Sequence, residues 1–259
     1  PIEVIVVDNH SSDATVAILD RDYPWVKLIQ NTENEGFAAA NNQGAARAAC
    51  PYLLIVNPDT KLKEGAVGAL LACLAADDRV GIAGPRILNA DGSVQRTCAR
   101  RGFTLAAALL CEALQLERLP LVGGLLTRKL LYPYDHGIGQ DIEAVSGAAF
   151  MVRSDLFSSL RGFDPDYFFG GEDLDLCFRA RKAGYAVRYC PASEVIHFGG
   201  GSSSKAEALT AVRAALSNQL YFLKTYGVGS ALADRLIAQL IRAPMLFVSC
   251  LTVAKGRPL

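Results

Sequence analysis

Apolar residues in the first ninety positions come in short runs that alternate with helical patterns. Residues 2–7 form an apolar run interrupted only by Glu3, which is typical of a buried strand. The pattern predicts strands at 2–7, 26–30, 52–56 and 80–83, and helices at 14–21, 36–49 and 64–76. Strands and helices that alternate at such short intervals predict a parallel α/β sheet. Ligands of such sheets bind beyond the carboxyl ends of the strands.

The second half of the chain changes character. Residues 105–131 are rich in Leu and Ala but are broken by Pro120 and Gly123-Gly124, so two short helices are expected, covering the sheet or forming a lid. Two further strands are predicted, one after a small-residue turn within residues 145–152 and one at 185–189. A long helix is predicted at 206–226, with apolar residues along one face.

The C-terminal apolar stretch is ambiguous. Residues 236–254 are about as long as one membrane span, but they carry Gln239, Arg242 and Pro244, which argue against a spanning helix. Two interpretations stay open. The segment is an amphipathic helix on a bilayer surface, or it packs on the protein itself or on a second copy.

Charge and cysteine content exclude some classes of protein. The formal net charge of the 259 residues is zero, so no electrostatic argument for nucleic acid follows. The seven cysteines form no Cys-x-x-Cys pair. Their odd number and spacing predict reduced thiols in a cytoplasmic protein and no disulfide framework.

Three acids crowd one predicted helix start. Glu172, Asp173 and Asp175 follow Gly170-Gly171 and precede a short amphipathic helix, where the backbone dipole favours negative charge. One acid is enough to cap a helix. The pattern therefore favours a general base beside a cleft, although excess capping and surface solubility would explain the same residues.

Polar residues also follow two predicted strands. Asp59, in Asn57-Pro58-Asp59, is suited to hold a divalent cation through oxygen, with a diphosphate supplying further ligands, but these residue types also favour turns. Asp8 and Asn9 are candidates to bind a nucleobase or ribose. The alternative there is a cluster that caps the next helix through Ser11 or Ser12.

Further along the chain, the stretch from Asn34 through Gly36 could direct backbone N–H groups to a phosphate at a helix start. Asn41 and Asn42, in the helix that follows, could instead be core amides bonded to the backbone. His197 ends a short apolar run, where a histidine is either structural or completes the metal site that Asp59 begins.

Three basic side chains are weaker candidates. They are suited to contact a diphosphate, but solvated surface charge is the favoured interpretation for Arg100, Arg101 and Lys205.

Six motifs in order resemble glycosyltransferase family 2, most of all its bacterial rhamnosyltransferase-like members. The first four are Val-Val-Asp-Asn-x-Ser-x-Asp, Asn-x-Gly-Phe-Ala-x-x-Asn-Asn, Asn-Pro-Asp and Ser-Gly-Ala-x-x-x-Val-Arg. The last two are Phe-Asp-x-x-Tyr-Phe-x-x-x-Glu-Asp-x-Asp-Leu-Cys-x-Arg and His-x-x-Gly-x-Ser. The resemblance covers residues 2–225.

The resemblance implies a GT-A fold, an α/β architecture with a mostly parallel Rossmann-like sheet flanked by helices, with C-terminal helices. By position, Asp8 matches the acid that contacts the nucleobase, and Asp59 the metal-binding acid of an Asp-x-Asp motif. Asp173 matches the general base, with Glu172 beside it near the acceptor, and His197 matches a histidine near the metal and diphosphate. The implied cofactor is a divalent cation, Mg2+ or Mn2+.

Two departures from the family pattern stand out. Asn57 replaces the first acid of the Asp-x-Asp pair, so fewer charges hold the cation. Family members also open with a strand and helix before the segment that begins at Pro1, so the resemblance predicts an N-terminally truncated chain with an incomplete site. On this basis, residues 1–204 are expected to form the GT-A domain and 205–259 a C-terminal helical segment, which is a candidate to associate with a membrane surface.

The predicted function is inverting, metal-dependent transfer of a sugar in cell-envelope polysaccharide synthesis. The expected donor is a dTDP- or UDP-linked sugar, with rhamnose leading, and the expected acceptor is a glycan or a polyprenyl-diphosphate-linked sugar. The expected location is the cytoplasm, including the inner face of the plasma membrane. Two alternatives stay open: a non-catalytic nucleotide-sugar-binding protein, and a sugar-phosphate nucleotidylyltransferase.

Overall fold

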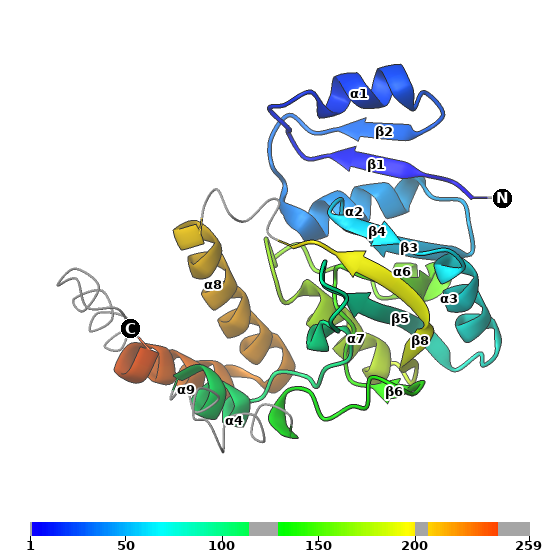
Figure 1. Ribbon diagram of the computed structural model, residues 1–259. Helices are drawn as coiled ribbons and strands as arrows, with labels where there is room; N and C mark the ends of the chain where they lie inside the picture. The colour runs from blue at the N-terminus through cyan, green and yellow to red at the C-terminus, as the bar shows by residue number, and fades with distance from the viewer. Residues whose placement is uncertain (1, 114–128, 200–206, 243–259) are drawn as a thin grey trace.

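Two sheets organise the chain in this computed structural model, which describes residues 2–113, 129–199 and 207–242 (Figure 1). In the smaller sheet, β1 (Ile5–Asp8) pairs in parallel with β2 (Lys27–Gln30). The larger sheet has the strand order β3-β7-β5-β8-β4, with β6 paired to β8. Its strands are β3 (Tyr52–Val56), β4 (Thr60–Leu62), β5 (Val80–Leu88), β6 (Gln140–Ile142), β7 (Ala149–Arg153) and β8 (Ala186–His197).

Helices cover these sheets and extend beyond them. The longer ones are α1 (Thr15–Asp22), α2 (Gly36–Arg47), α3 (Ala66–Ala75), α7 (Glu172–Lys182), α8 (Glu207–Tyr226) and α9 (Val228–Ile237). Short α, 3-10 and π segments are α4 (Leu105–Ala107), α6 (Ser154–Ser159), η1 (Arg96–Cys98), η2 (Ala108–Ala113) and η5 (Ala238–Arg242). In Figure 1, α1 and the small sheet form an outer layer at one end, and α8 and α9 project from the side of the large sheet, at the left of the view.

The predicted α/β architecture is confirmed, with mixed strand pairing. β1 with β2 and β5 with β8 run parallel, whereas β3, β4 and β6 each pair antiparallel. The strands predicted at 80–83 and 185–189 are both longer than expected. They lie side by side at the centre of the sheet, where each extends the hydrogen-bond ladder of the other.

The predicted cap of the first helix is wrong. Helix α1 begins at Thr15 after Ala14, and no side chain caps it. Asp13 accepts hydrogen bonds from the backbone N–H of Thr15 (3.0 Å) and from its hydroxyl (2.5 Å). The side chain that shapes the turn before α1 is therefore Asp13, and not Ser11 or Ser12.

The core lies between the large sheet and α7. Phe163, which is fully buried, makes edge-on ring contacts with Phe37, Phe150 and Phe157. These rings come from the α2 side, the central sheet and α6. The loop that leads into α7 is therefore anchored in the middle of the core.

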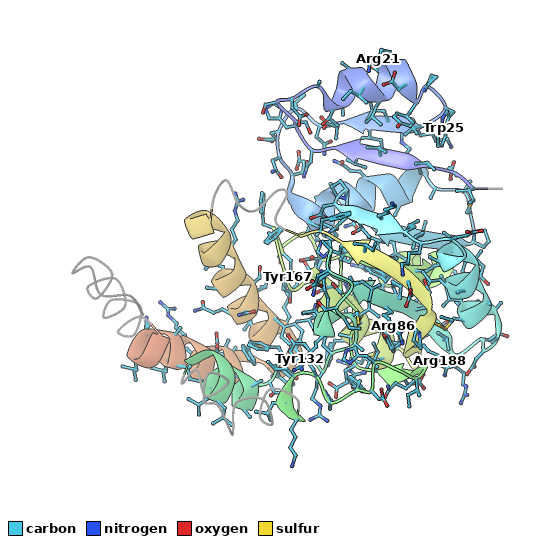
Figure 2. All side chains as sticks on the ribbon, in the orientation of Figure 1. Arg21, Trp25, Arg86, Tyr132, Tyr167 and Arg188 are labelled. Carbon is cyan, nitrogen blue, oxygen red and sulfur yellow. A yellow bond between two sulfur atoms is a disulfide. The ribbon has the colours of Figure 1, made fainter. Side chains whose placement is uncertain are left out.

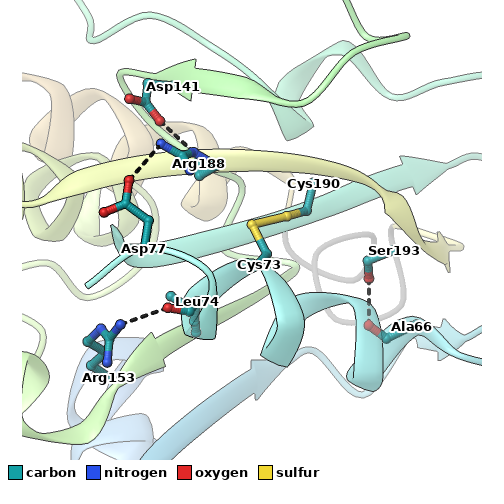
Figure 3. The surroundings of a disulfide bond; sticks show 9 residues. All are labelled: Ala66, Cys73, Leu74, Asp77, Asp141, Arg153, Arg188, Cys190 and Ser193. Carbon is teal, nitrogen blue, oxygen red and sulfur yellow. Dashed lines mark hydrogen bonds and ion pairs between the residues drawn. A yellow bond between two sulfur atoms is a disulfide. The ribbon is translucent and has the colours of Figure 1, made fainter. Parts of the chain in front are cut away.

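A disulfide corrects the prediction of reduced thiols. Cys73 on α3 bonds to Cys190 on β8 across 117 residues of sequence (Figure 3). Nearby, the Ser193 hydroxyl donates to the Ala66 carbonyl at 2.9 Å, so α3 is tied to β8 at two points. Cysteine spacing could not reveal this pair, because only the packing of α3 on the sheet brings the two residues together.

The C-terminal helices remain outside the sheets. None of the helices within the described residues is long and apolar enough to cross a membrane. The rest of the ambiguous segment, 243–259, and most of the predicted lid, 114–128, lie outside the described residues.

Candidate active site

The dipeptide Gly147-Ala148, just before β7, lies at the centre of the candidate site. The Asn57 backbone N–H donates to the Ala148 carbonyl at 2.9 Å, and the Gly147 N–H donates to Asp173 at 2.7 Å. The turn after β3 and the start of α7 therefore contact adjacent residues. A side chain at Gly147 would come within 3.2 Å of the Asp173 carboxylate, so only glycine permits this approach without displacing Asp173.

Asp59 and His197 meet beside Thr60, whose hydroxyl donates to the Ala148 carbonyl at 3.3 Å. Antiparallel pairing of β4 with β8 places Thr60 opposite His197, and this brings His197 Nε2 to 3.2 Å from Asp59 Oδ1. Gln95 fixes the imidazole: its amide Nε2 donates to the His197 carbonyl at 2.8 Å, and its Oε1 lies 3.1 Å from His197 Nδ1. Because Oε1 can only accept, Nδ1 carries a proton.

This arrangement fits a cation. In a neutral imidazole with a proton on Nδ1, Nε2 is an acceptor, and it faces the acceptor Oδ1 of Asp59. The contact is favourable only if a second proton or a metal ion lies between the two atoms. Within the described ranges, no group of three His, Cys, Asp or Glu side chains could hold a metal, so these two residues would contribute part of a ligand set. Mg2+ in particular is commonly held by few protein ligands together with substrate phosphates.

Asp173 contacts Gly147, the other residue of the dipeptide. Its Oδ2 accepts from Arg100 Nη2 at 2.5 Å and from the Gly147 N–H, and its Oδ1 accepts from the Leu174 N–H at 2.7 Å. A carboxylate offers about four acceptor positions. Three are filled by the protein, so one position on Oδ1 remains for a substrate hydroxyl.

Glu172 is buried next to Asp173 but is held differently. Its Oε2 has no hydrogen-bond partner in the part of the chain that the structure describes. Burial, and then the neighbouring charge of Asp173, raise the pKa of Glu172 to about 8. At neutral pH Glu172 is therefore mainly protonated.

The third acid of the cluster is structural. Asp175 is buried and accepts a hydrogen bond from Arg179 one turn later at 2.7 Å. Arg179 also donates to the carbonyls of Leu160 (2.7 Å) and Gly162 (3.0 Å). This pair ties α7 to the end of α6.

Asp8 ends β1 with a buried carboxylate that is half satisfied. Its Oδ2 accepts from the Ser11 N–H at 3.2 Å, and its Oδ1 is buried without a partner among the residues described. Beside it, Asn9 donates to Asn34 Oδ1 (3.0 Å) and to the Gly36 carbonyl (3.2 Å). These bonds hold the loop after β2 against the end of β1, with Asp8 Oδ1 left to accept from a ligand.

The start of α2 does not offer its first N–H groups to a phosphate. The N–H of Glu35 donates to Asn9, that of Gly36 to Asn34, and that of Phe37 to the Phe168 carbonyl, all at 3.0 Å. Asn34 and Gly36 therefore shape the loop.

The core-amide interpretation of the asparagines in α2 is confirmed. Asn42 bonds to both the N–H and the carbonyl of Phe163, at 2.9 and 2.8 Å, and Asn41 donates to the Phe37 carbonyl at 2.9 Å.

The predicted residues thus fall into two groups. Asn57 and Asp173 bond to Gly147-Ala148, and the first group also includes the Asp59–His197 pair and Glu172, the sequence neighbour of Asp173. The Asn57 Oδ1 is buried without a partner among the described residues. Asp8, Asn9, Asn34 and Gly36 form a second group at the end of β1. Phe168 links the groups, because it contacts α2 and lies four residues before Glu172.

Two residues were missed or misjudged from sequence. Gln95 carries no motif, and only its contact with His197 reveals it. Arg100 was expected to be solvated surface charge, but 22% of its side chain is exposed and it pairs with Asp173. Arg101 pairs with Glu143 at 3.3 Å on a more exposed surface, and Lys205 lies outside the described residues.

Comparison with known proteins gives a consistent family. The family model described as "Glycosyl transferase family 2" matches residues 1–158. The chain is 31% identical over 210 residues to an N-acetylglucosaminyl-diphospho-decaprenol L-rhamnosyltransferase of Mycobacterium tuberculosis, covering 76% of this chain and 66% of that protein. It is 24% identical to a low-salt glycan biosynthesis hexosyltransferase of Haloferax volcanii, covering 75% of this chain and 58% of that one. The chain thus spans about two thirds or less of the length of these relatives.

Solved structures show the same fold at low identity. A mannosyltransferase from Pyrobaculum calidifontis, in complex with GDP-Man and Mn2+, superposes with a TM-score of 0.55 at 17% identity, over 97% of this chain and 71% of that one. Residues 1–349 of TarS from S. aureus, in complex with UDP-GlcNAc, superpose with a TM-score of 0.51 at 16% identity, over 92% and 62% of the two chains.

Proposed function

Because this chain belongs to glycosyltransferase family 2, we propose that it transfers a sugar from a nucleotide-diphospho-sugar to a hydroxyl of a glycan or lipid-linked acceptor, with inversion at the anomeric carbon. The observation that carries this proposal is the placement of two chemically different sites on the two sides of Gly147-Ala148. One side has the Asp59–His197 pair, which suits a cation, and the other has the Asp173 carboxylate with one free acceptor position.

These two sites match the two charges that develop in an in-line displacement. The bond from the anomeric carbon to the diphosphate oxygen breaks, and its electron pair leaves with the diphosphate. A divalent cation, when bound, stabilises that leaving charge, and Asp59 and His197 are the residues that would hold it. On the other side, Asp173 accepts the proton of the acceptor hydroxyl as its oxygen bonds to the anomeric carbon, a role that contributes about 10²- to 10⁴-fold in rate.

The nucleotide is proposed to bind at the end of β1. The buried Asp8 Oδ1 lacks a donor among the described residues, and a pyrimidine or ribose carries suitable N–H and O–H groups. We propose a dTDP- or UDP-linked donor with rhamnose leading, by analogy with the rhamnosyltransferase relative. That relative's name also supports an acceptor sugar on a polyprenyl diphosphate, and hence a role in cell-envelope polysaccharide synthesis.

Calorimetry tests the donor site. The chain is titrated with dTDP, UDP and GDP, each with and without Mg2+ or Mn2+. We expect metal-dependent binding of dTDP or UDP, at least tenfold weaker in Asp59→Asn because a carboxylate ligand is lost. Asp22→Asn, an exposed acid at the end of α1, is the matched control. If nucleotide binding is the same with and without metal, and in wild type and Asp59→Asn, then no cation takes part in donor binding.

Transfer assays test the acceptor side. We expect Asp173→Asn to lower kcat by about 10²- to 10⁴-fold while nucleotide binding changes little, because the base acts only on the acceptor. Unchanged transfer by Asp173→Asn would show that the base lies elsewhere. Nucleotide binding without transfer in the wild type would favour a binding module.

An apolar stripe along the C-terminal helices supports membrane-surface binding at the cytoplasmic face. Val228, Leu232, Leu236 and Leu240 recur every four residues along α9 and η5, and each is 54–71% exposed. A lipid-linked acceptor would lie in the same plane as a helix bound in this way. Cosedimentation with anionic vesicles tests the idea. Leu232→Glu should release the chain from the vesicles, whereas Ile18→Glu, an exposed apolar site on α1, should not.

A further inference from the structure

Arg100 approaches the acid pair from a segment that carries none of the six motifs. Its backbone is paired with Ala144 in both directions at 3.0 Å, which fixes where the side chain begins. From there the guanidinium reaches Asp173 Oδ2 at 2.5 Å. The guanidinium therefore reaches Asp173 from a backbone that is anchored by Ala144, outside α7.

The contact is selective between the two acids. Arg100 forms an ion pair with Asp173, and the Gly147 N–H donates to the same Oδ2. Both donors approach one oxygen, so they fix the plane of the carboxylate and leave Oδ1 to carry the free acceptor position. Glu172 Oε2, by contrast, has no partner among residues 2–113, 129–199 and 207–242.

We propose that Arg100 is a positioning residue for sugar transfer, which holds the Asp173 carboxylate by Oδ2 so that Oδ1 takes the proton of the acceptor hydroxyl. This inference rests on the proposed function. The proton moves from the acceptor oxygen to Asp173 Oδ1, the acceptor oxygen bonds to the anomeric carbon, and the electron pair of the broken bond leaves on the diphosphate. Arg100 keeps its own protons throughout.

Charges around the pair are consistent with this role. Burial is the largest single effect and lowers the pKa of Arg100, but Asp173 and the other neighbouring groups together raise it by more, so the guanidinium stays charged. The other titratable groups that face Arg100 and Asp173 are Glu172, Cys177 and Tyr132. Of these, Glu172 is the carboxylic acid, and burial raises its pKa to about 8.

The first test is activity against pH. In Arg100→Met, kcat should fall roughly 10- to 100-fold because the base is misplaced. The acid limb of kcat/KM should move up by about one pH unit or more, because a cation beside the base is lost. Arg100→Lys should return the limb toward its wild-type position and recover part of kcat. Nucleotide binding should stay within about twofold, since the donor site is not touched.

Arg101→Met is the matched control. It removes the neighbouring arginine, which pairs with Glu143, and should leave the acid limb in place. If Arg100→Met lowers activity equally at every pH and Arg100→Lys does not rescue it, Arg100 is only structural and the inference is wrong.

A second measurement does not depend on turnover. Thermal unfolding of wild type, Arg100→Met, Asp173→Asn and the double variant forms a cycle. We expect each single change to lower Tm by several degrees, and the double variant to lose clearly less than the sum. Additive losses would overturn the pairing. The wild-type chain could also show no nucleotide binding and no sugar transfer while the cycle shows coupling. That result would refute the proposed function and the role of Arg100 in transfer, but it would confirm the contact between Arg100 and Asp173.

Discussion

The outer layer of α1, β1 and β2 and the acid-bearing helix α7 are held by different forces. Helix α1 buries none of its residues, and in β1 only Asp8 is buried. Helix α7 instead has a nearly continuous buried stretch that includes all three of its acids. In Figure 2, Arg21 and Trp25 lie on the outer rim of the layer, while Tyr167 lies in the interior, near α7.

This difference indicates that the outer layer serves mainly ligand binding, whereas α7 contributes to the stability of the fold as well. The outer layer is held mainly by amide and backbone hydrogen bonds, such as those of Asn9 and Asn34, which contribute about 1 kcal/mol each. Such a region opens at low cost and can adapt to a ligand. Helix α7 is fixed by the core, so a change in its acids alters folding and chemistry together.

The largest expected effect tests the core side. Phe163→Ala should lower the free energy of unfolding by about 3–5 kcal/mol, because a fully buried ring with three aromatic neighbours is removed. Ile29→Ala, at a partly buried position in β2, should cost about 1 kcal/mol. Urea unfolding measures both. Equal losses would mean that the outer layer is packed as firmly as the core.

The next prediction concerns pH. The raised pKa of Glu172, to about 8, means that the folded state binds a proton which the unfolded state has lost above its ordinary pKa of 4.5. Its contribution to stability is therefore present below about pH 4.5 and is lost as the pH rises through about 8. We expect Glu172→Gln to be more stable than wild type at pH 8.5, by roughly 1–3 kcal/mol.

Urea unfolding between pH 5 and 9 measures this slope. Glu33→Gln, an exposed acid in the outer layer, should leave the wild-type profile unchanged. A profile for Glu172→Gln that is as steep as that of the wild type would show that Glu172 titrates normally.

A smaller effect is expected where the two regions meet. Gly36 has a φ of +84°, and a Cβ there would lie 2.8 Å from the Phe168 carbonyl. Gly36→Ala should cost about 2 kcal/mol, from backbone strain and the displaced carbonyl. Gly65 has a similar φ of +77° with open space around it, so Gly65→Ala reports strain alone. Thermal unfolding should show the greater loss of stability for Gly36→Ala. Equal losses would mean that the approach to the Phe168 carbonyl adds nothing to the cost of backbone strain.

The smallest effect is expected at the surface clamp between α8 and the loop before α7. Lys224 donates to Asp164 (2.5 Å) and to Asp166 (2.6 Å), with 30% of its side chain exposed. Lys224→Met should cost about 0.5–1 kcal/mol by urea unfolding. Arg21→Met should cost close to nothing, because the Arg21–Asp22 pair is highly exposed. A loss at Lys224 above that of Gly36→Ala would reverse this ranking.

The sequence by itself determined the local structure and the family. Apolar periodicity predicted the strands and helices of the first ninety residues, because burial of one face follows from spacing along the chain. The ordered motifs brought in Asp8, Asp59, Glu172, Asp173 and His197 as candidates. Their local roles could be proposed because each follows a strand end or a helix start.

Only the tertiary structure decided which partners these residues have. Arg100 and Asp173 are separated by 73 residues, Gln95 and His197 by 102, and Cys73 and Cys190 by 117. No local pattern encodes such pairs. A surface arginine and a buried arginine look alike in sequence, and so do a free cysteine and a bonded one. Asp175 makes the same point, since its neighbours in sequence suggested catalysis and its contacts show an anchor for α7. A residue's chemistry depends on burial and on nearby charge, and packing across the sheet sets both.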